Sequence, residues 1–405
     1  MKTIQLISIV FLFFGCKNDK EVKASKEVMS SEIAQNFIII EQDYNKALKI
    51  ASKENKLIFV DFYTTWCAPC KKLDKAVFKN HSIQKILKKD FILLKYDAEN
   101  DTVFHLAKKH HVSSYPTAII LNKNGFVLNR KYGFPGDDFK TLSKNVLKLT
   151  DESIELNREN HIIEGYSNKI DATIYPKFYV DYVNRTNTKI NPNELNEYWN
   201  HKQAIFSEEY FSTLIYFNRE ASSKVANLAL KNREKYTNIY GKTDVNILMY
   251  FLTSGRFDEA ISEKSQEKFN DAIAFANKAL SSESAKNTIN YYKKDFLKAQ
   301  NKWSEVFEIN KKLKENGEFD NGYVNNFSWQ VYKDCEDPEV IKKCLQWMKE
   351  VTNQEPTYGY LDTYAHLMYK SGDKKETKKI AQLAIEAGKK EDRNTKSVEK
   401  LLNNL

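Results

Sequence analysis

The pattern Cys-x-x-Cys at positions 67–70 is the part of this 405-residue chain whose residue types and spacing could most clearly do chemistry. It follows an apolar strand pattern at 57–63, and a helical pattern begins at Cys70. Unpaired backbone N–H groups and the dipole at a helix start stabilise an anion, so the Cys67 thiol should ionise more readily than a free thiol. Pro69 suits the first helical turn, where its missing N–H costs nothing. The pattern predicts a nucleophilic thiolate at Cys67 and a resolving thiol at Cys70.

The same spacing would also suit half of a zinc site or two buried thiols. A structural zinc ion takes four ligands, which usually include a second Cys or His pair at short spacing. His81 stands alone near the cysteines, and Cys335 and Cys344 are remote in the sequence. Redox chemistry is therefore the favoured interpretation. We expect no metal and no other cofactor, since the chain has no nicotinamide-binding or flavin-binding motif.

This stretch resembles the thioredoxin family from about residue 37 to residue 149. The resemblance rests on Trp66, the two cysteines and the lysine after them, on Asp61 in the preceding strand pattern, and on a proline loop farther along. It implies the α/β thioredoxin fold, a mixed sheet flanked by helices, and thiol:disulfide oxidoreductase activity. Trp66, Ala68 and Pro69 would then contact the substrate.

Asp61 matches the position at which the family keeps a buried carboxylate beneath the second cysteine. Such an acid helps to move the proton on and off the resolving thiol, and desolvation would raise its proton affinity. Lys95, in the strand pattern at 91–97, matches the lysine that accompanies this acid. A solvated charge at a strand end is the alternative interpretation of Lys95.

Pro116 matches the cis-proline loop that the family carries opposite the two cysteines. The resemblance, and not the residues alone, implies the cis geometry, because cis X–Pro bonds are uncommon. The backbone of Tyr115 would then face Cys67 and offer hydrogen bonds to an extended substrate segment. Many thioredoxins have a smaller residue before this proline, so substrate preference is left open.

The order of strand and helix patterns in this stretch also predicts a mixed sheet flanked by helices. An apolar strand at 37–40 precedes a helix capped by Asp43, and Ser82 is expected to cap another helix. Asn-Gly at 124–125 is typical of a hairpin, so the last two strands should be antiparallel. The sequence pattern and the family fold agree.

The first residues have the composition of an export signal. Lys2 precedes an apolar run at 4–14 that is too short to span a bilayer as a helix. Gly15-Cys16 resembles a lipoprotein cleavage site, at which Cys16 would become the lipidated first residue. An uncleaved or ordinarily cleaved signal, in which Cys16 is incidental, is the alternative. We therefore expect an exported protein of the cell envelope, anchored to a membrane through lipid and facing the periplasm or the outer surface.

Beyond residue 150 the patterns are predominantly helical, in a chain with only 12 Gly and 7 Pro. The similar phrases Ser254–Ala260 and Ser371–Thr377 are both expected between helices, and self-comparison suggests a repeat period of about 34 residues. These features resemble degenerate tetratricopeptide units, and an irregular helical bundle is the alternative. Aromatic residues between 157 and 217 are expected in the helical core, with a peptide-binding surface as the alternative. The predicted organisation is a signal segment at 1–16, a flexible linker at 17–36, a thioredoxin-like domain at 37–150 and an all-α, tetratricopeptide-like domain at 151–405.

Charge and cysteine content limit the partners. The net charge of +9 is spread along the chain and comes almost entirely from lysine. Proteins that read nucleic acids favour clustered basic residues with arginine, so no nucleic-acid partner is expected. Cys335 and Cys344 are expected as two buried thiols in packed helices, with a structural disulfide as the alternative.

Together these features predict a membrane-tethered thiol:disulfide oxidoreductase that acts on protein disulfides outside the cytoplasm. Cys-Ala-Pro-Cys lies closer to reducing thioredoxins than to oxidants or isomerases, so we expect reduction, with electrons from a membrane partner. One alternative is a helical-repeat adaptor or scaffold lipoprotein whose thioredoxin-like domain serves mainly for binding. A narrower alternative is delivery of reductant to apocytochrome cysteines, for which the sequence offers nothing specific.

Overall fold

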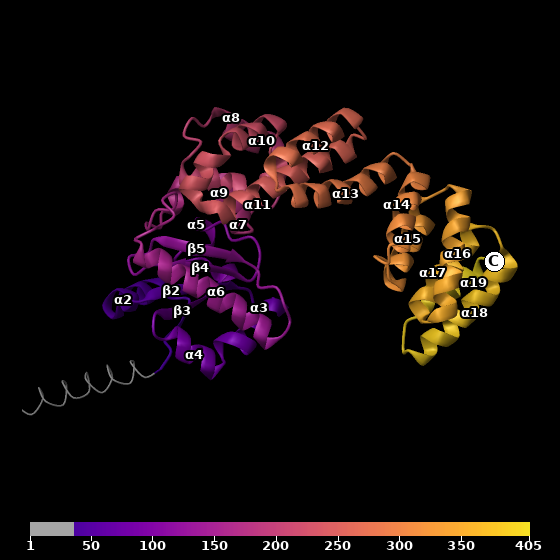
Figure 1. The fold of residues 1–405 in the computed structure, drawn as a ribbon, viewed down its shortest axis with the longest axis horizontal. Coiled ribbons are helices and arrows are strands. Elements are labelled where there is room, and N and C mark those ends of the chain that lie inside the picture. The colour runs from indigo at the N-terminus through magenta and orange to yellow at the C-terminus, as the bar shows by residue number, and fades with distance from the viewer. Residues whose placement is uncertain (1–35) are drawn as a thin grey trace, which may run out of the picture. The chain divides into compact units, whose positions relative to one another are not determined.

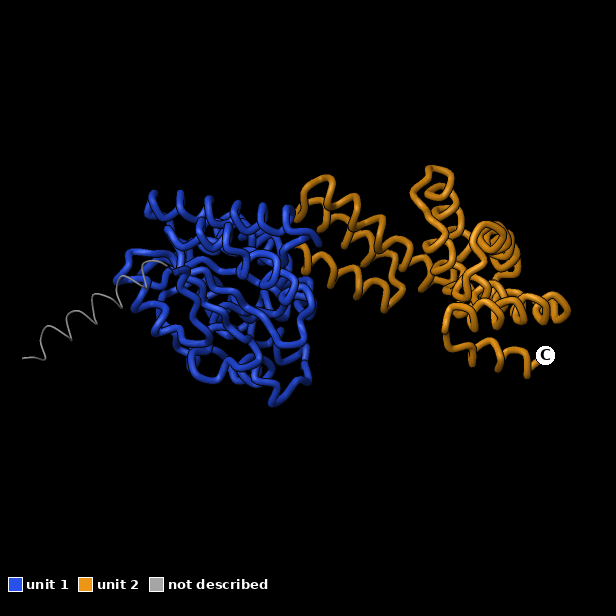
Figure 2. Tube along the Cα trace, turned by 90° about the horizontal axis from the view of Figure 1, so that it is seen from below, with its two compact units in different colours: residues 1–249 blue, residues 250–405 orange. Residues whose placement is uncertain are grey.

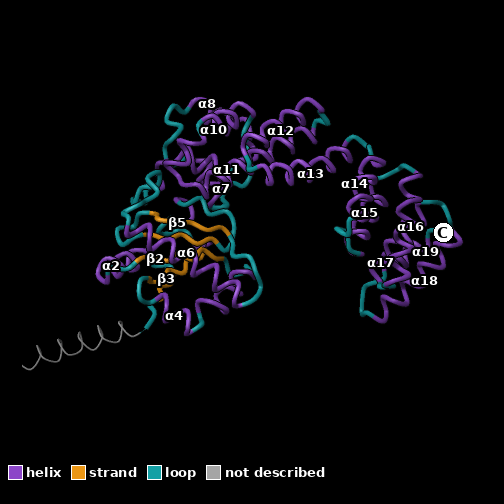
Figure 3. The backbone as a smooth tube through the Cα atoms, viewed as in Figure 1, coloured by secondary structure: helices purple, strands orange, loops and turns teal. Residues whose placement is uncertain are grey.

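The computed structural model describes residues 36–405, and this part of the chain divides into two compact units. The first unit ends at Met249 and the second begins at Tyr250 (Figure 2). Among the described residues, all strands lie between Ile39 and Tyr132, and the rest of the chain is helices and loops (Figure 3). The predicted fold class, an α/β thioredoxin fold followed by a helical region, is confirmed.

The sheet of the first unit has five strands in the order β1-β3-β2-β4-β5 (Figure 1). The strands are β1 (Ile39–Glu41), β2 (Leu57–Tyr63), β3 (Phe91–Asp97), β4 (Thr117–Leu121) and β5 (Val127–Tyr132). β3 is parallel to β1 and β2, whereas β4 is antiparallel to β2 and β5. The predicted hairpin joins β4 to β5, and Gly125 has the positive φ of 83° that favours glycine in such a turn.

The helical segments around the sheet are α2 (Tyr44–Glu54), α3 (Ala68–Leu73), the π-helical turn η1 (Asp74–Phe78), α4 (His81–Leu87), α5 (Leu106–Lys109) and α6 (Phe139–Arg158). One apolar cluster joins α3, η1, α4 and α6 to the sheet, and Leu57 and Phe59 of β2 belong to it. Side chains along a strand point alternately to the two faces of the sheet, so Asp61 lies on the same face as these two residues. The face of the sheet that α3 covers is therefore the face to which Asp61 belongs.

Two helix starts in this unit test the predicted caps. The Asp43 side chain accepts a hydrogen bond from the Lys46 N–H at 2.9 Å, so the predicted cap of α2 is confirmed. The predicted cap at Ser82 is wrong. Asn80 caps α4 instead and accepts from the Ser82 N–H at 3.0 Å, because the helix already begins at His81 and an asparagine before it is an equally good cap.

Further helices belong to the first unit: α7 (Lys177–Val183), α8 (Pro192–His201), α9 (Glu208–Tyr216), α10 (Ser223–Lys231) and the beginning of α11 (Arg233–Ser262). The segment 161–166 connects them to the sheet. Its Ile163 N–H donates to the Val127 carbonyl of β5, and its Gly165 N–H donates to the Ile239 carbonyl of α11, both at 2.8 Å. Gly165 allows this approach, since a Cβ there would lie 2.3 Å from the Tyr240 ring. The first compact unit thus extends well beyond residue 150, where the sequence places the start of the helical region.

A buried polar cluster also holds these helices on the sheet. Asp244 of α11 lies 3.1 Å from Nη1 of Arg130 on β5, and it accepts hydrogen bonds from the hydroxyls of Tyr132, at 3.0 Å, and Tyr166. His111 contributes a ring nitrogen 3.6 Å from the same carboxylate. The aromatic residues of this helical part are mainly core, as expected: Tyr179 and Trp199 are fully buried.

The second unit is helical throughout. After the end of α11 its helices are α12 (Gln266–Ala279), α13 (Ser282–Ala299), α14 (Trp303–Glu315), α15 (Asn321–Asp334), α16 (Pro338–Gln354), α17 (Tyr358–Lys370), α18 (Lys374–Lys390) and α19 (Lys396–Asn403). The phrase at Ser371–Thr377 covers the turn between α17 and α18, as expected, but Ser254–Ala260 lies inside α11. That placement was wrong because a single glycine in a helix is tolerated, at a cost of about 1 kcal/mol.

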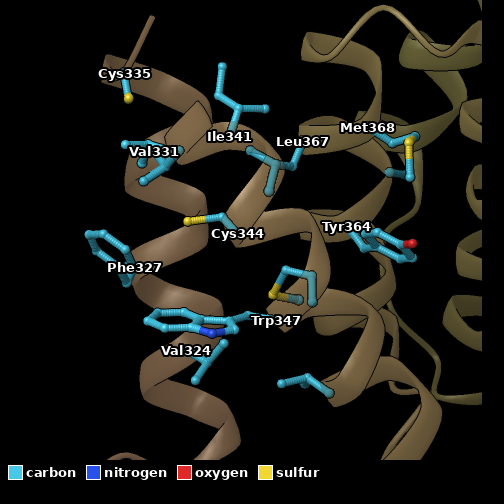
Figure 4. Close-up of a cluster of buried hydrophobic side chains, with 14 of the residues drawn as sticks. Val324, Phe327, Val331, Cys335, Ile341, Cys344, Trp347, Tyr364, Leu367 and Met368 are labelled. Atoms are coloured by element: carbon cyan, nitrogen blue, oxygen red, sulfur yellow. The ribbon is translucent and has the colours of Figure 1, made fainter. Parts of the chain in front are cut away.

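The core of the second unit contains the two remaining cysteines. Cys335 and Cys344 are free thiols and lie in one apolar cluster with Val331, Trp347 and Leu367 (Figure 4). The expectation of two buried thiols is therefore confirmed. Within residues 36–405, no helix combines the length and the apolar character needed to cross a bilayer.

Candidate active site

Cys67 and Cys70 form a disulfide at the start of α3, with their Cα atoms 5.3 Å apart. Cys67 is the N-cap residue of α3, and its Sγ accepts a hydrogen bond from the Cys70 N–H at 3.1 Å. The helical segment continues through η1 to Phe78, so the helix dipole adds to this hydrogen bond. In the reduced protein, the same N–H and the same dipole would stabilise a Cys67 thiolate.

Asp61 belongs to the central strand and is only 2% exposed. Its neighbours across the sheet are Lys95 on β3 and Ala118 on β4. Within the described part of the chain, its Oδ1 has no hydrogen-bond partner. Burial raises the pKa of Asp61 to about 7, and the Lys95 charge opposes this shift only in part. A carboxyl group with this pKa can both accept and donate a proton near neutral pH.

Lys95 is held by acidic groups and is not a solvated charge at a strand end. Its Nζ lies 2.8 Å from Asp74 Oδ1 and 3.9 Å from Glu41 Oε1, and its side chain is 16% exposed. Burial alone would lower the pKa of Lys95, but the hydrogen bond and the charge of Asp74 raise it above its usual value. Lys95 therefore stays charged and connects Asp74 to the edge of the Asp61 site.

Two further acidic residues of the site, Asp74 and Glu41, were not predicted from the sequence. A signal for Asp74 was available, because it stands four residues after Cys70 in a helical pattern and so shares its face. Glu41 could be found only from the sheet order, since its register partner Lys95 lies on a strand that is not next to it in the sequence.

The proline loop lies where the resemblance implies. The Tyr115–Pro116 bond is cis. Strand β4 begins directly after this loop, and its Thr117 is paired with Phe62 of β2, so the loop lies beside the turn that carries the cysteines. The rings of Trp66 and Tyr115 are 6.0 Å apart, edge to face. Within residues 36–405, no other backbone group hydrogen-bonds to the Tyr115 backbone, which leaves its N–H and C=O for a substrate strand.

The other predicted contact residues form an exposed rim around the two buried cysteines. Trp66 is 62% exposed, and Ala68 and Pro69 are also exposed. The indole Nε1–H of Trp66 donates to Glu99 Oε2 at 3.0 Å. The structure thus brings together all the predicted site residues of the thioredoxin-like domain, whereas Cys16 lies outside the described residues. Residues 36–405 contain no group of three or more His, Cys, Asp or Glu side chains placed to hold a metal ion.

Part of this chain is similar to known proteins. Residues 39–123 match the thioredoxin-like family. Thioredoxin-1 of Drosophila melanogaster is 34% identical over 107 residues, which cover 26% of this chain and 90% of that protein. The chain belongs to the thioredoxin family. A protein disulfide-isomerase of Datisca glomerata is 32% identical over 111 residues, 27% of this chain and 22% of that protein. The solution structure of a thioredoxin from Thermus thermophilus matches 30% of this chain and 93% of that one, with 17% identity and a TM-score of 0.26.

As a thioredoxin-family member with its Cys-x-x-Cys pair intact, the protein is a thiol:disulfide oxidoreductase. The relatives account for its cysteine pair and its sheet. They match only about a quarter of this chain, so the helices after α6 are additions to the part that they share.

Proposed function

We propose that this oxidoreductase reduces disulfides of exported proteins while a lipid on Cys16 anchors it to a membrane. The observation that carries the reducing chemistry is the Cys67–Cys70 pair at the start of α3, on the face of the sheet to which Asp61 belongs, whose Oδ1 has no hydrogen-bond partner among the described residues. Export and anchoring are supported by the charged residue, apolar run and Gly15-Cys16 at the beginning of the sequence.

The reaction is an exchange of one disulfide for another. The Cys67 thiolate attacks one sulfur of the substrate disulfide, which forms a mixed disulfide and releases the first substrate thiolate. The Cys70 thiolate then attacks the Cys67 sulfur and releases the second substrate thiolate. The substrate gains two electrons and two protons, and the protein loses the same number as its own Cys67–Cys70 disulfide forms. A membrane-bound dithiol donor would return the pair to the reduced state.

Asp61 has the properties that the second step requires. Cys70 must lose its proton before it attacks, and the cysteines are almost closed off from water, with exposures of 3% and 4%. A carboxylate with a pKa of about 7 can take that proton and later release it. The Tyr115 backbone would hold the substrate segment during both steps.

Trapping of the mixed disulfide tests this function. In a Cys70→Ser variant of the full chain, the second step is blocked, so exported proteins should accumulate as covalent adducts that reductant releases. A Cys67→Ser variant, matched in every other respect, should form none. The adducts should be recovered with the membrane fraction, and Cys16→Ala should move them to the soluble fraction. Absence of adducts would favour the scaffold alternative, in which the thioredoxin-like domain only binds.

The direction of the reaction is tested by the reduction potential of the cysteine pair. A reductase of the thioredoxin type should lie near about −270 mV, and a value above roughly −150 mV would overturn the assignment as a reductant.

A further inference from the structure

A cavity of about 890 Å³ opens beside the active site, within the first unit. One wall comes from the thioredoxin-like domain, between Ala98 and Tyr115. The other wall comes from the added helices, namely residues 182–186 and 188 after and within α7, and Tyr216 at the end of α9. Its volume lies near the upper end of the roughly 300–1,000 Å³ that ligand pockets occupy. It therefore has room for several residues of another chain.

The cavity is continuous with the site at which substrate must bind. Tyr115 lines it, and the same residue precedes the cis proline and presents its backbone to the substrate. A second connection runs along the rim through Glu99, which accepts from Trp66 at 3.0 Å and lies 3.4 Å from Nη2 of Arg185. A polypeptide whose disulfide lies at Cys67 would meet this cavity with the residues next to its cysteine.

The charges around the cavity are balanced. Glu99 is paired with Arg185 at its rim, and Asp101 is paired with Lys108 at 3.2 Å in its buried wall. The remaining surface includes the tyrosines Tyr115, Tyr182 and Tyr216. Tyrosine offers an aromatic face together with a hydroxyl group, which suits peptide groups and uncharged side chains. A small charged disulfide would therefore have to compete with an existing ion pair here.

Arg185 provides an exposed guanidinium group at this rim, just after the end of α7. Arg185 has a φ of 60°, in the left-handed region that favours glycine at the end of a helix such as α7. Its side chain is 67% exposed, and its guanidinium group has donors beyond the one that faces Glu99.

We propose that this cavity is a binding groove for the extended, uncharged polypeptide segment that flanks the cysteine of a protein substrate. The proposal rests on the proposed function and adds that the helices after α6 select polypeptides over low-molecular-weight disulfides. Tyr115 holds the segment close to Cys67, and the wall formed by Tyr182, Arg185 and Tyr216 holds the residues beyond it.

The test compares three disulfides with the full-length protein: insulin, glutathione disulfide and bis(2-hydroxyethyl) disulfide. Thr188 lines the cavity and is exposed, so Thr188→Trp fills the groove without disturbing the core. We expect kcat/KM for insulin to fall about tenfold, which corresponds to one lost anchoring contact, and the rates with both small disulfides to stay within about twofold. Ser52→Trp, at an exposed position of α2 outside the groove, is the matched control and should change none of them.

A second variant tests the rim without adding bulk. Arg185→Gln should also slow insulin reduction selectively. Its control is Arg158→Gln, because Arg158 is 68% exposed and pairs with Glu155 much as Arg185 pairs with Glu99. An unchanged insulin rate in both groove variants, or an equal fall with glutathione disulfide, would overturn the groove. A wild-type protein that reduces none of the three disulfides would instead defeat the proposed function, and the groove with it.

Discussion

Two of the buried aspartates of the first unit, Asp61 and Asp244, have very different surroundings. Asp61, on the strand beneath the cysteines, is 2% exposed and has an oxygen without a partner among the described residues. Asp244, on α11, is 1% exposed, and both of its oxygens are engaged by Arg130 and two tyrosines. Burial raises the pKa of Asp61 to about 7. Burial also opposes ionisation of Asp244, but the Arg130 charge, together with His111 and the Tyr166 hydrogen bond, outweighs it and lowers the pKa to about 2.

The difference separates a carboxylate that reacts from one that holds the fold together. A buried carboxylate with a cationic partner and hydrogen bonds to both oxygens stays ionised, and removal of either partner leaves a buried charge uncompensated. A buried carboxylate with incomplete pairing is expensive when charged, and such groups are kept mainly at functional sites. The pair also shows that burial alone does not identify a catalytic acid, because the partners decide the direction of the pKa shift.

The largest expected effect on stability comes from breaking the ion pair between Asp244 and Arg130. Asp244→Asn leaves Arg130 buried without its counter-charge, and the free energy of unfolding at pH 7 should fall by about 3–5 kcal/mol. Urea unfolding measures this loss. Asp244 and Arg130 take no part in the thiol–disulfide exchange, so the insulin-reducing rate per folded molecule should be unchanged. Adding Arg130→Met should recover part of the lost stability. A loss below about 1 kcal/mol would show that the two aspartates do not differ as described.

Replacement of Asp61 should change the free energy of unfolding in the opposite direction. The pKa of Asp61 is raised from 3.8 to about 7, so the folded protein binds a proton more tightly than the unfolded chain between these values. The cost of burying the charge therefore grows as pH rises through this window and is complete above pH 7. Asp61→Asn should stabilise the protein by up to about 4 kcal/mol at pH 8, and the gain should vanish near pH 4. Unfolding curves at both pH values, with Asp90→Asn as an exposed control, measure it. A variant less stable than wild type at pH 8 would contradict the raised pKa.

The smallest effects test the groups that adjust Asp61. Lys95→Met removes a charge that lowers the pKa of Asp61, so this pKa should rise by about one unit. Asp74→Asn removes a charge that raises it and frees Lys95 from its closest partner, so the pKa of Asp61 should fall by a similar amount. Titration of the Asp61 carboxyl carbon by NMR distinguishes the two. Shifts of the same sign in both variants would show that the contact between Lys95 and Asp74 does not adjust the site.

The parts of the site that could be predicted from sequence are those marked by local patterns. Cys67, Cys70 and Asp61 lie within ten residues of one another, and the strand-turn-helix pattern around them is strong. The cis proline needed the family resemblance, and the structure confirms it at Pro116. Asp74 was missed although its spacing from Cys70 was a usable signal.

The rest of the site depends on contacts between distant segments. Glu99 and Arg185 are separated by 86 positions, and no periodicity indicates that they meet. The same holds for Arg130 and Asp244, which belong to a strand and to a helix that begins a hundred residues later. The sequence pattern predicts Tyr182 and Tyr216 as helical core, and only the folded structure shows that they also line a cavity. A lone glycine is also a weak signal for the end of a helix, since Gly255 lies within α11.

The hydrogen bond from Ile163 to Val127 has a consequence for how this enzyme meets its substrates. Proteins with wrong disulfides are partly unfolded, and their exposed strands can add to any open sheet edge and begin an aggregate. In the first unit, residues 161–166 cover the start of the edge strand β5, and the opposite edge strand β1 is only three residues long. These two features shorten the free sheet edge to which a partly unfolded polypeptide could add as a strand.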